Sequence, residues 1–283
     1  MSLRDTVKKI PLARRLYARW RQVTAPRRRR QSAYGYLRQK RQAVERWLNE
    51  SNEDTNLTYD LTELNIKYLA TFLAAVTDAP VGKARSYLDE ILGDQELAQH
   101  IARATGRADR DLRAVSDPVA RYGRRIGWYA VARLVKPRVV VETGVDKGIG
   151  ACVLTAALRR NVGEGHEGRY FGTDINPRAG WLLGEPYAQF GEILYGDSLE
   201  SLRRLERMID LFINDSCHSK EYERAEYDLV ATKLSEKGIV LGDNAHCTAE
   251  LYEFAQRANR RFLYFQECPQ DHWYPGGGIG VAF

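Results

Sequence analysis

The segment VVVETGVDKG at residues 139–148 decides the fold of this 283-residue chain. Its apolar run ends in the acidic residue Glu142, and a turn containing Gly144 and Gly148 leads into a helical stretch. Four further apolar runs end in an acid in the same way, at Asp174, Asp197, Asp215 and Asp243. Alternating strands and helices predict a parallel sheet, so these strand-end acids gather along the edge where open α/β sheets bind ligands.

The order of elements in the second half of the chain predicts the α/β class. We expect strands at 138–144, 169–175, 191–196, 209–215, 238–243 and 261–267. Helices are expected between them at 149–160, 178–188, 199–206, 219–235 and 248–258. The last run, GIGVAF at 278–283, follows a loop without a crossover helix, so it is predicted as a seventh strand antiparallel to its neighbour.

Composition is that of a soluble globular protein, with 44% hydrophobic residues. No apolar run approaches the roughly 20 residues that span a bilayer, and the N-terminus lacks the apolar core of a secretory signal. The cysteines Cys152, Cys217, Cys247 and Cys268 are scattered and form no CxxC pair, which argues against a zinc site or a disulfide framework. A cytoplasmic location is therefore expected.

Charge is distributed unevenly along the chain. Residues 1–48 contain 15 of the 43 Lys and Arg residues and 2 of the 37 acidic residues, a charge of +13. The remaining 28 basic and 35 acidic residues give the rest of the chain a charge of −7. The net charge of +6 therefore describes neither part.

The basic segment has several interpretations. Pro11 and Pro26 bracket a predicted short helix with Trp20, and Arg27–Arg30 follow. Such a helix suits a weak contact with an anionic membrane at the inner surface. A solvated extension, or an arm packed on another copy in a homo-oligomer, explains it equally well. Nucleic acid is disfavoured because no nucleic-acid-binding motif accompanies the charge.

A helical region precedes the sheet. Apolar residues at 61–77 and 84–104 show helical spacing, and a third helix is expected from Pro118 to Val135 with Asp117 as its N-cap. Residues 49–58 are polar and predict a linker. The predicted parts are a basic arm (1–55), a helical cap (56–135) and a ligand-binding sheet domain (136–283).

The glycine loop after the first strand indicates the kind of ligand. A dinucleotide fold places a glycine-rich turn here to hold a pyrophosphate, whereas this chain has Asp146 in the loop. A carboxylate opposes a phosphate but not a cationic sulfonium. Asp174 is suited to accept hydrogen bonds from ribose hydroxyls, and Asp197-Ser198 to accept one from an adenine amino group. Purely structural roles remain open, including a capping box of Asp197 with Glu200.

In strand order and spacing, about residues 120–283 resemble class I S-adenosylmethionine-dependent methyltransferases, which have a Rossmann-like seven-stranded sheet with the last strand antiparallel. The resemblance implies that Glu142, Gly144 and Gly148 hold the methionine part of the cofactor. It likewise implies that Asp174 binds ribose and that Asp197 with Ser198 contacts adenine. The chain is similar to bacterial O-methyltransferases that act on sugars or secondary metabolites, which implies a small-molecule hydroxyl acceptor.

Two strand ends carry a candidate metal site. Asp215 and, 28 residues later, Asp243-Asn244 offer two carboxylates and an amide oxygen, which are hard ligands suited to Mg²⁺. The pattern is similar to the metal site of catechol O-methyltransferase and of metal-dependent sugar O-methyltransferases. A metal-independent methyltransferase, in which both acids only shape the edge of the site, is the alternative.

A histidine follows the first of these acids. His218 lies three residues after Asp215, and a neutral imidazole accepts a hydroxyl proton near neutral pH. The catechol enzyme has a lysine base at the similar position, so the catalytic assignment to His218 departs from that pattern. His246 and His272 are secondary candidates. Trp273 and Tyr274 are candidates for the acceptor pocket.

Three other functions compete with methyl transfer to a small molecule. A nicotinamide-dependent oxidoreductase uses a similar sheet, but Asp146 argues against it. A non-catalytic methyltransferase-like module tethered by the basic arm is expected to lose the strand-end acids, all of which are present. A nucleic-acid methyltransferase is suggested by Arg27–Arg30 and opposed by the acidic charge of the remaining chain.

Overall fold

The computed structural model describes residues 11–55 and 57–283, except the side chain of Pro11. They form two compact units. One consists of helix α2 (Pro11–Glu50) with the loop Asp271–Trp273, and the other contains residues 51–270 and 274–283. The boundaries 55/56 and 135/136 between the basic arm, the helical cap and the sheet domain stay predictions.

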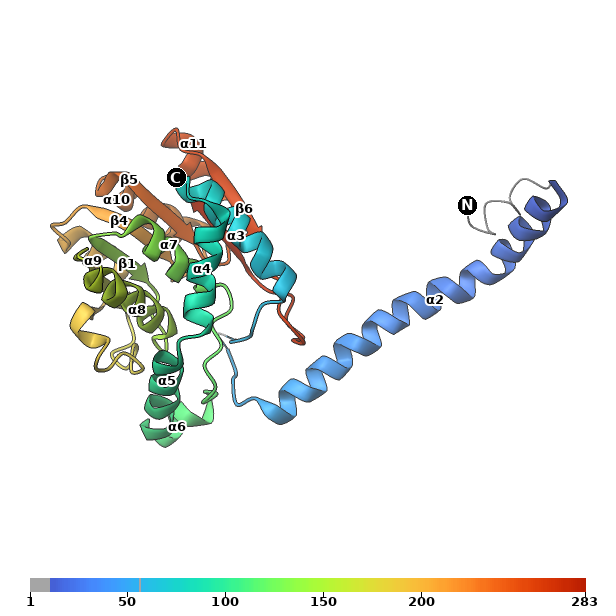
Figure 1. Cartoon of the computed structure of the whole chain (residues 1–283), viewed down its shortest axis with the longest axis horizontal. Helices are drawn as coiled ribbons and strands as arrows, with labels where there is room; N and C mark the ends of the chain where they lie inside the picture. Colours follow the sequence, from blue (N-terminus) through green and yellow to red (C-terminus); the bar gives the residue numbers. More distant parts are fainter. Residues whose placement is uncertain (1–10, 56) are drawn as a thin grey trace. The chain divides into compact units, whose positions relative to one another are not determined.

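A seven-stranded sheet with the order β3-β2-β1-β4-β5-β7-β6 forms the centre of the larger unit (Figure 1). Strands β1 to β5 are parallel to one another, whereas β7 is antiparallel to both β5 and β6. The predicted α/β class and the antiparallel last strand are therefore confirmed. The strands are β1 Val139–Thr143, β2 Arg169–Asp174, β3 Gly191–Tyr195, β4 Ile209–Asn214, β5 Leu234–Gly242, β6 Phe262–Gln266 and β7 Gly278–Ala282.

Helices cover both faces of the sheet. Because side chains alternate along a strand, Val140 and Leu211 enter one apolar cluster, while their neighbours Val141 and Phe212 enter the other. The first cluster contains side chains of α3, α4, α5, α7 and α8, and the second those of α9, α10 and α11. The helices are α3 Glu63–Thr77, α4 Val81–Leu92, α5 Gln95–Arg107, α6 Arg110–Ala114, α7 Arg125–Val135, α8 Ile149–Gly163, α9 Ser198–Arg204, α10 Lys220–Ala231 and α11 Glu250–Arg257.

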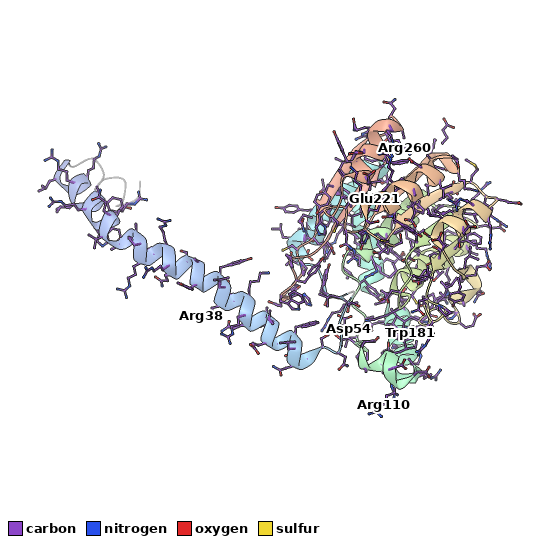
Figure 2. The ribbon with its side chains drawn as sticks, turned by 180° about the vertical axis from the view of Figure 1, so that it is seen from behind. Arg38, Asp54, Arg110, Trp181, Glu221 and Arg260 are labelled. Atoms are coloured by element: carbon purple, nitrogen blue, oxygen red, sulfur yellow. The ribbon has the colours of Figure 1, made fainter. Side chains whose placement is uncertain are left out.

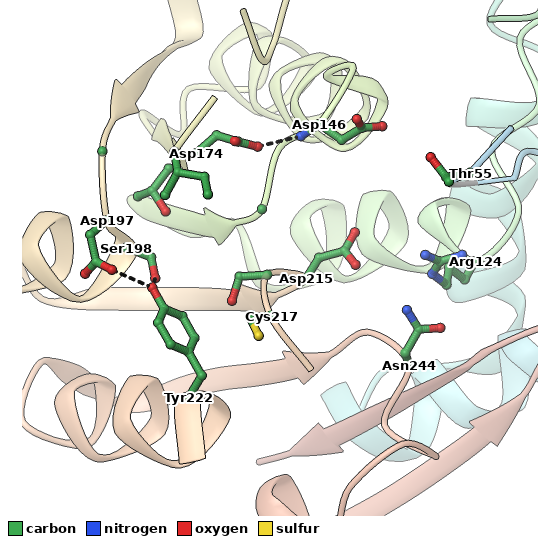
Figure 3. A pocket seen from close by; sticks show the side chains of 15 residues that line it. Thr55, Arg124, Asp146, Asp174, Asp197, Ser198, Asp215, Cys217, Tyr222 and Asn244 are labelled. Atoms are coloured by element: carbon green, nitrogen blue, oxygen red, sulfur yellow. Dashed lines mark hydrogen bonds between the residues drawn. The ribbon is translucent and has the colours of Figure 1, made fainter. Parts of the chain in front are cut away.

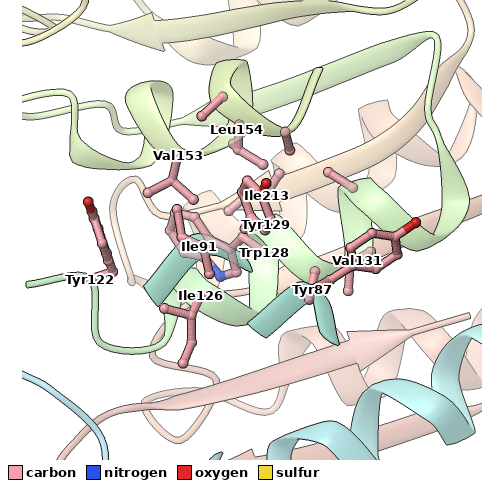
Figure 4. Close-up of a cluster of buried hydrophobic side chains, with 14 of the residues drawn as sticks. Tyr87, Ile91, Tyr122, Ile126, Trp128, Tyr129, Val131, Val153, Leu154 and Ile213 are labelled. Carbon is pink, nitrogen blue, oxygen red and sulfur yellow. The ribbon is translucent and has the colours of Figure 1, made fainter. Parts of the chain in front are cut away.

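The helical cap thus shares the core of the sheet domain. Trp128 and Tyr129 of α7 and Ile91 of α4 are fully buried in the first cluster (Figure 4). Burying aromatic and aliphatic side chains of this size is the main driving force for folding. The helices N-terminal to β1 therefore complete one layer of the fold.

The helix predicted at 178–188 is wrong. Only the short 3-10 helix η1 (Ala188–Phe190) forms near it, because two amides early in the segment bond to the glycine loop and not to helical partners within the segment. The Gly180 amide donates to the carbonyl of Asp146, and the Leu182 amide donates to that of Lys147. Gly180 has φ +72°, which also interrupts a right-handed helix.

The N-terminal end predicted for the third helix of the cap, at Pro118, is also wrong. Helix α7 begins at Arg125 and not at Pro118, and Asp117 does not cap it. The Asp117 carboxylate instead accepts from the Ser51 hydroxyl and from the Asn52 amide, at 2.8 Å each. The predicted helical stretch 84–104 forms two helices, α4 and α5, and Asp94 caps the second through the Leu97 amide.

The arm is a longer helix than the prolines predict. Helix α2 continues through Pro26 to Glu50, so the short helix and the start of the linker at 49 are both wrong. A proline removes one hydrogen bond, which the many arginines and glutamines of this segment, good helix formers, outweigh. Figure 2 shows the side chains along α2, including Arg38. Trp47 contacts the rings of His272 and Trp273.

No helix in the described ranges, 11–55 and 57–283, combines the length and the apolar character needed to cross a bilayer.

We expect Leu88→Ala in α4 to lower the free energy of unfolding by about 2–5 kcal/mol, because it leaves a cavity in the core shared by cap and sheet. The Leu88 side chain is 0% exposed. Leu92→Ala in the same helix is the control, because Leu92 is 41% exposed, and it should cost only about 0.5 kcal/mol. Urea denaturation followed by circular dichroism measures both, and equal effects would contradict a shared core.

Candidate functional site

A cavity of about 580 Å³ opens at the carboxyl ends of the parallel strands (Figure 3). Its volume lies within the range of small-molecule sites. Residues at or just after the ends of five neighbouring strands, β3, β2, β1, β4 and β5, contribute to its wall, and they include Gly144, Asp174, Asp197, Ser198, Asp215 and Asn244. Strand direction therefore brings together the side chains that the sequence predicted at one edge.

The glycine loop is shaped by close backbone packing. Gly144 has φ +82°, and a Cβ on it would lie 2.0 Å from the carbonyl oxygen of Asp215. Gly148 has φ +99° and precedes α8, with a Cβ position 3.0 Å from the Cα of Gly180. Only glycine fits at position 144, so the loop lies directly against the end of β4.

Asp174 holds this loop in place. One oxygen of its carboxylate accepts from the amides of Val145 at 3.0 Å and Asp146 at 2.9 Å, and the other accepts from the Asn176 amide at 2.8 Å. Asp174 also lines the cavity, so a ligand there meets the carboxylate that orders the loop. Its structural role and its predicted ligand-binding role are compatible.

Asp197 is the N-cap of α9, and its side chain accepts from the Glu200 amide. Its second oxygen accepts from the hydroxyl of Tyr222 at 3.0 Å, and Ser198 lies 2.8 Å from the same hydroxyl. The expected cap is present, although Glu200 itself is paired with Arg203. Tyr222, which the sequence analysis missed, joins α10 to this side of the cavity.

Glu142 lies beneath the loop, 1% exposed, and not in the cavity wall formed by the described residues. Its carboxylate accepts a hydrogen bond from the Tyr170 hydroxyl at 2.5 Å. Burial raises the pKa of Glu142 to about 8, so it carries a proton near neutral pH. Its predicted contact with a cofactor stays a prediction.

Asp215, Asp243 and His218 converge at the ends of β4 and β5. Ligand atoms of the three lie within 4.8 Å of one another. His218 Nε2 is 3.8 Å from an oxygen of Asp215, and its Nδ1 is 2.9 Å from an oxygen of the buried Glu223. Asn244 Nδ2 lies 3.1 Å from Asp243 Oδ2. Asp215 and Asn244 are among the residues that line the cavity, and His218 is not.

Electrostatics differ among these groups. Burial raises the pKa of Asp215, and the neighbouring Asp243 raises it further. Burial alone would also raise the pKa of Asp243, but the Arg124 guanidinium holds it below its usual value. Burial opposes the charged form of His218, yet its bonds to Asp215 and Glu223 raise its pKa to about 10. The imidazole is therefore charged in this arrangement.

Arg124, just before α7, binds both carboxylate oxygens of Asp243 through Nε and Nη2. The pair is buried, and Arg124 also lines the cavity. The neighbouring Arg125 has Nη2 3.6 Å from an oxygen of Asp215. The donor set for the predicted Mg²⁺ is present, but in this arrangement a guanidinium engages both oxygens of one ligand. These residues as placed do not fit a resident dication.

Sequence reasoning missed Arg124 because no motif surrounds it and it belongs to the helical cap. Ile175, directly after Asp174, was missed as well, although an apolar side chain after a strand-end acid is a usable signal. It is 77% exposed and lines the cavity. His246 is exposed, and His272 and Trp273 contact α2. Tyr274 lies near Tyr59, with ring centroids 5.9 Å apart.

Several solved structures are similar to this chain. The S-adenosylhomocysteine-bound methyltransferase PaMTH1 from Podospora anserina is 16% identical, with 66% of this chain and 87% of that chain covered and a TM-score of 0.47. The O-methyltransferase TomG from Streptomyces achromogenes is 17% identical, with 67% of this chain and 89% of that chain covered and a TM-score of 0.47. TomG is involved in tomaymycin synthesis, and its structure is a complex with S-adenosylmethionine. An O-methyltransferase from Bacillus cereus with S-adenosylhomocysteine is 15% identical (70% and 90%, TM-score 0.46).

No curated protein matches the chain. A family model described as a methyltransferase domain matches residues 141–245. The matched segment runs from within β1 to just beyond β5 and contains the glycine loop and all five strand-end acids. This part of the chain is therefore similar in sequence to methyltransferase domains.

Proposed function

We propose that this protein is an S-adenosylmethionine-dependent methyltransferase that methylates a hydroxyl oxygen of a small molecule, such as a sugar or a secondary metabolite. The observation that supports it best is the cavity at the carboxyl edge of the sheet, where Asp174 and Asp197 flank the glycine loop. The methyltransferase family match over residues 141–245 supports the same cofactor.

The cavity wall suits a cationic cofactor that carries hydroxyl and amino donors. Asp146, Asp174 and Asp197 together oppose the pyrophosphate of a dinucleotide but accept hydrogen bonds from ribose and adenine. Ile175 offers an exposed apolar surface to a flat base. Gly144 lets the ligand approach the loop backbone. In this proposal Glu142 and Gly148 keep the shape of the loop from below.

When bound, S-adenosylmethionine supplies a methyl carbon already activated by sulfonium; the acceptor oxygen bonds to it as the carbon–sulfur bond breaks and its electron pair goes to sulfur. The protein must place the acceptor oxygen about 3 Å from that carbon, on the side away from sulfur. It must also take the hydroxyl proton, because a neutral alcohol is a weak nucleophile.

We assign proton removal to the pair of Asp215 and His218. Asp215 lines the cavity, and His218 Nε2 lies 3.8 Å from one of its carboxylate oxygens. Glu223 binds Nδ1 of the imidazole, and its other oxygen accepts from the hydroxyl of Thr248. A carboxylate that binds one ring nitrogen fixes the orientation of the other, which here lies 3.2 Å from Asn244 Nδ2 and 3.8 Å from an oxygen of Asp215. His218 is the predicted general base of the pair; it accepts the proton only in its neutral form, so kcat should rise with pH toward its pKa of about 10.

Cofactor binding tests the proposed function directly. We expect S-adenosylhomocysteine to bind the full chain in isothermal titration calorimetry and Asp174→Asn to weaken its affinity about 10- to 100-fold, because a charged hydrogen-bond acceptor is lost. Asp210→Asn is the matched control: Asp210 also accepts from two backbone amides, those of Arg138 and Val139, but lies at the other end of β4. The affinity of the Asp210→Asn variant for S-adenosylhomocysteine should equal that of the wild-type protein.

Two outcomes of this titration would reject the proposal. Binding of NAD⁺ in place of S-adenosylhomocysteine would favour the oxidoreductase alternative. Binding of neither compound by the folded chain would favour a non-catalytic module.

Measurement of turnover tests the assignment of His218 as the general base. We expect His218→Ala to lower kcat about 100-fold or more while the affinity for S-adenosylhomocysteine is retained, because the imidazole acts on the acceptor proton. Transfer of a radiolabelled methyl group to a panel of phenols, catechols and sugars measures kcat. His246→Ala is the control, since His246 is exposed, and it should leave kcat unchanged. An unchanged kcat in His218→Ala would remove His218 from the mechanism.

For α2 we propose a weak contact with an anionic lipid surface. The helix contains twelve Lys or Arg residues and two acidic ones. Leu12, Leu16, Trp20 and Val23 are spaced by four or three residues, so they share one side of the helix, and all are exposed. Positive charge on every copy of α2 opposes pairing with a second copy and favours a negatively charged surface.

Co-sedimentation with vesicles tests this contact. We expect the full chain to bind phosphatidylserine-containing vesicles more strongly than phosphatidylcholine vesicles. Replacing Arg27–Arg30 by Ser should lower that affinity more than about tenfold, at about 1 kcal/mol per charge. Replacing Arg203 and Arg204 by Ser is the control. Equal affinity for both kinds of vesicle, or dimers in light scattering without lipid binding, would contradict the proposal.

A further inference from the structure

The guanidinium of Arg124 lies where the sequence pattern calls for a divalent cation. Asp215, Asp243 and Asn244 form the expected set of oxygen donors, yet Arg124 engages both oxygens of Asp243. Figure 3 shows Arg124 beside Asn244, across the pocket from Asp174 and Asp197. The positive charge at this point of the cavity is therefore carried by a side chain of the protein itself.

The surrounding residues hold this arginine in place. The Gly123 amide donates to the Tyr59 carbonyl at 2.8 Å, and Gly123 has φ +51° with the Tyr59 ring 3.1 Å from its Cβ position. The Tyr59 hydroxyl lies 3.5 Å from Arg124 Nη1 and donates to Glu267 Oε2 at 3.0 Å. Arg124 is 5% exposed. A buried side chain with this many fixed partners is a built feature of the site.

Charge around the arginine opposes an additional dication. The nearby carboxylates of Asp215, Asp243 and Glu267 face the two guanidinium groups of Arg124 and Arg125. A divalent ion bound by Asp215 and Asp243 would lie a few ångströms from both guanidiniums, where repulsion in a poorly solvated site is strong. It would also have to displace a bidentate ion pair, which leaves a buried charge without its partner.

We propose that Arg124 takes the place of the divalent cation, so that this chain binds no metal ion at Asp215 and Asp243 and Arg124 contacts the acceptor oxygen. The contact with the acceptor rests on the proposed methyltransferase function, whereas the exclusion of the cation does not. In this arrangement the positive guanidinium stabilises the negative charge that grows on the acceptor oxygen as its proton leaves.

The replacement also changes which acceptors fit. A dication binds two neighbouring oxygens of its substrate at once, which selects catechols and vicinal diols. Of the five N–H groups of Arg124, one on Nε and one on Nη2 bond Asp243 and one on Nη1 faces Tyr59, so one on Nη1 and one on Nη2 are left for the acceptor. Without a chelating dication the acceptor needs no second, neighbouring hydroxyl, so the acceptor class includes compounds with a single hydroxyl, such as phenols.

Electron paramagnetic resonance of Mn²⁺, a stand-in for Mg²⁺ with the same oxygen preference, tests the exclusion on the full chain. We expect the wild-type protein to leave the signal of free Mn²⁺ unchanged. Arg124→Ala should bind one equivalent, because it releases the carboxylate of Asp243, and Asp215→Asn in that background should abolish the binding. Arg121→Ala, which removes an exposed arginine three residues earlier, is the control and should bind none.

The proposal would be overturned if the wild-type protein binds Mn²⁺ and if Asp215→Asn removes that binding. This measurement does not depend on whether Arg124→Ala folds. A folded Arg124→Ala variant that binds no Mn²⁺ would overturn the exclusion by Arg124. Methyl transfer to phenols should also persist in excess EDTA. If EDTA abolishes the activity and Mg²⁺ restores it, the proposal is overturned. If neither cofactor binding nor transfer is found, the proposed function fails while the Mn²⁺ result still decides the exclusion.

Discussion

The buried ion pair between Arg124 and Asp243 joins the two halves of the larger unit at its functional edge. Arg124 comes from the end of the helical cap, and Asp243 directly follows β5. Neither charge is stable in a buried position alone, so each depends on the other for its ionised form. Any rearrangement of the cap relative to the sheet would break this pair, which couples the position of the cap to the chemistry of the cavity.

A second dependence links the glycine loop to its neighbours. The loop amides bind Asp174, its glycine at 144 packs on the backbone of Asp215, and the segment after β2 donates to its carbonyls. The loop is therefore held by three different parts of the sheet edge before any ligand arrives. Such preorganisation lowers the entropic cost of binding and keeps the strand-end acids at fixed separations.

The succession of strands and helices along the chain was predictable because its signals are local. Short apolar runs that end in Glu or Asp predict strands, and the alternation with helices predicts their direction. The prediction failed where distant contacts override local preference. The segment 178–188 bonds to the glycine loop, and Asp117 bonds to Ser51 and Asn52. None of these partners is visible in a sequence window.

The sequence by itself determined the class of fold and the gathering of acids at one edge, because parallel strands must all end on the same side. Only the tertiary structure decided what each acid faces: Glu142 lies under the loop, Asp174 holds it, and Asp243 binds an arginine. The physical reason is that the charge of a buried carboxylate is set by neighbours within a few ångströms, and those neighbours come from remote parts of the chain.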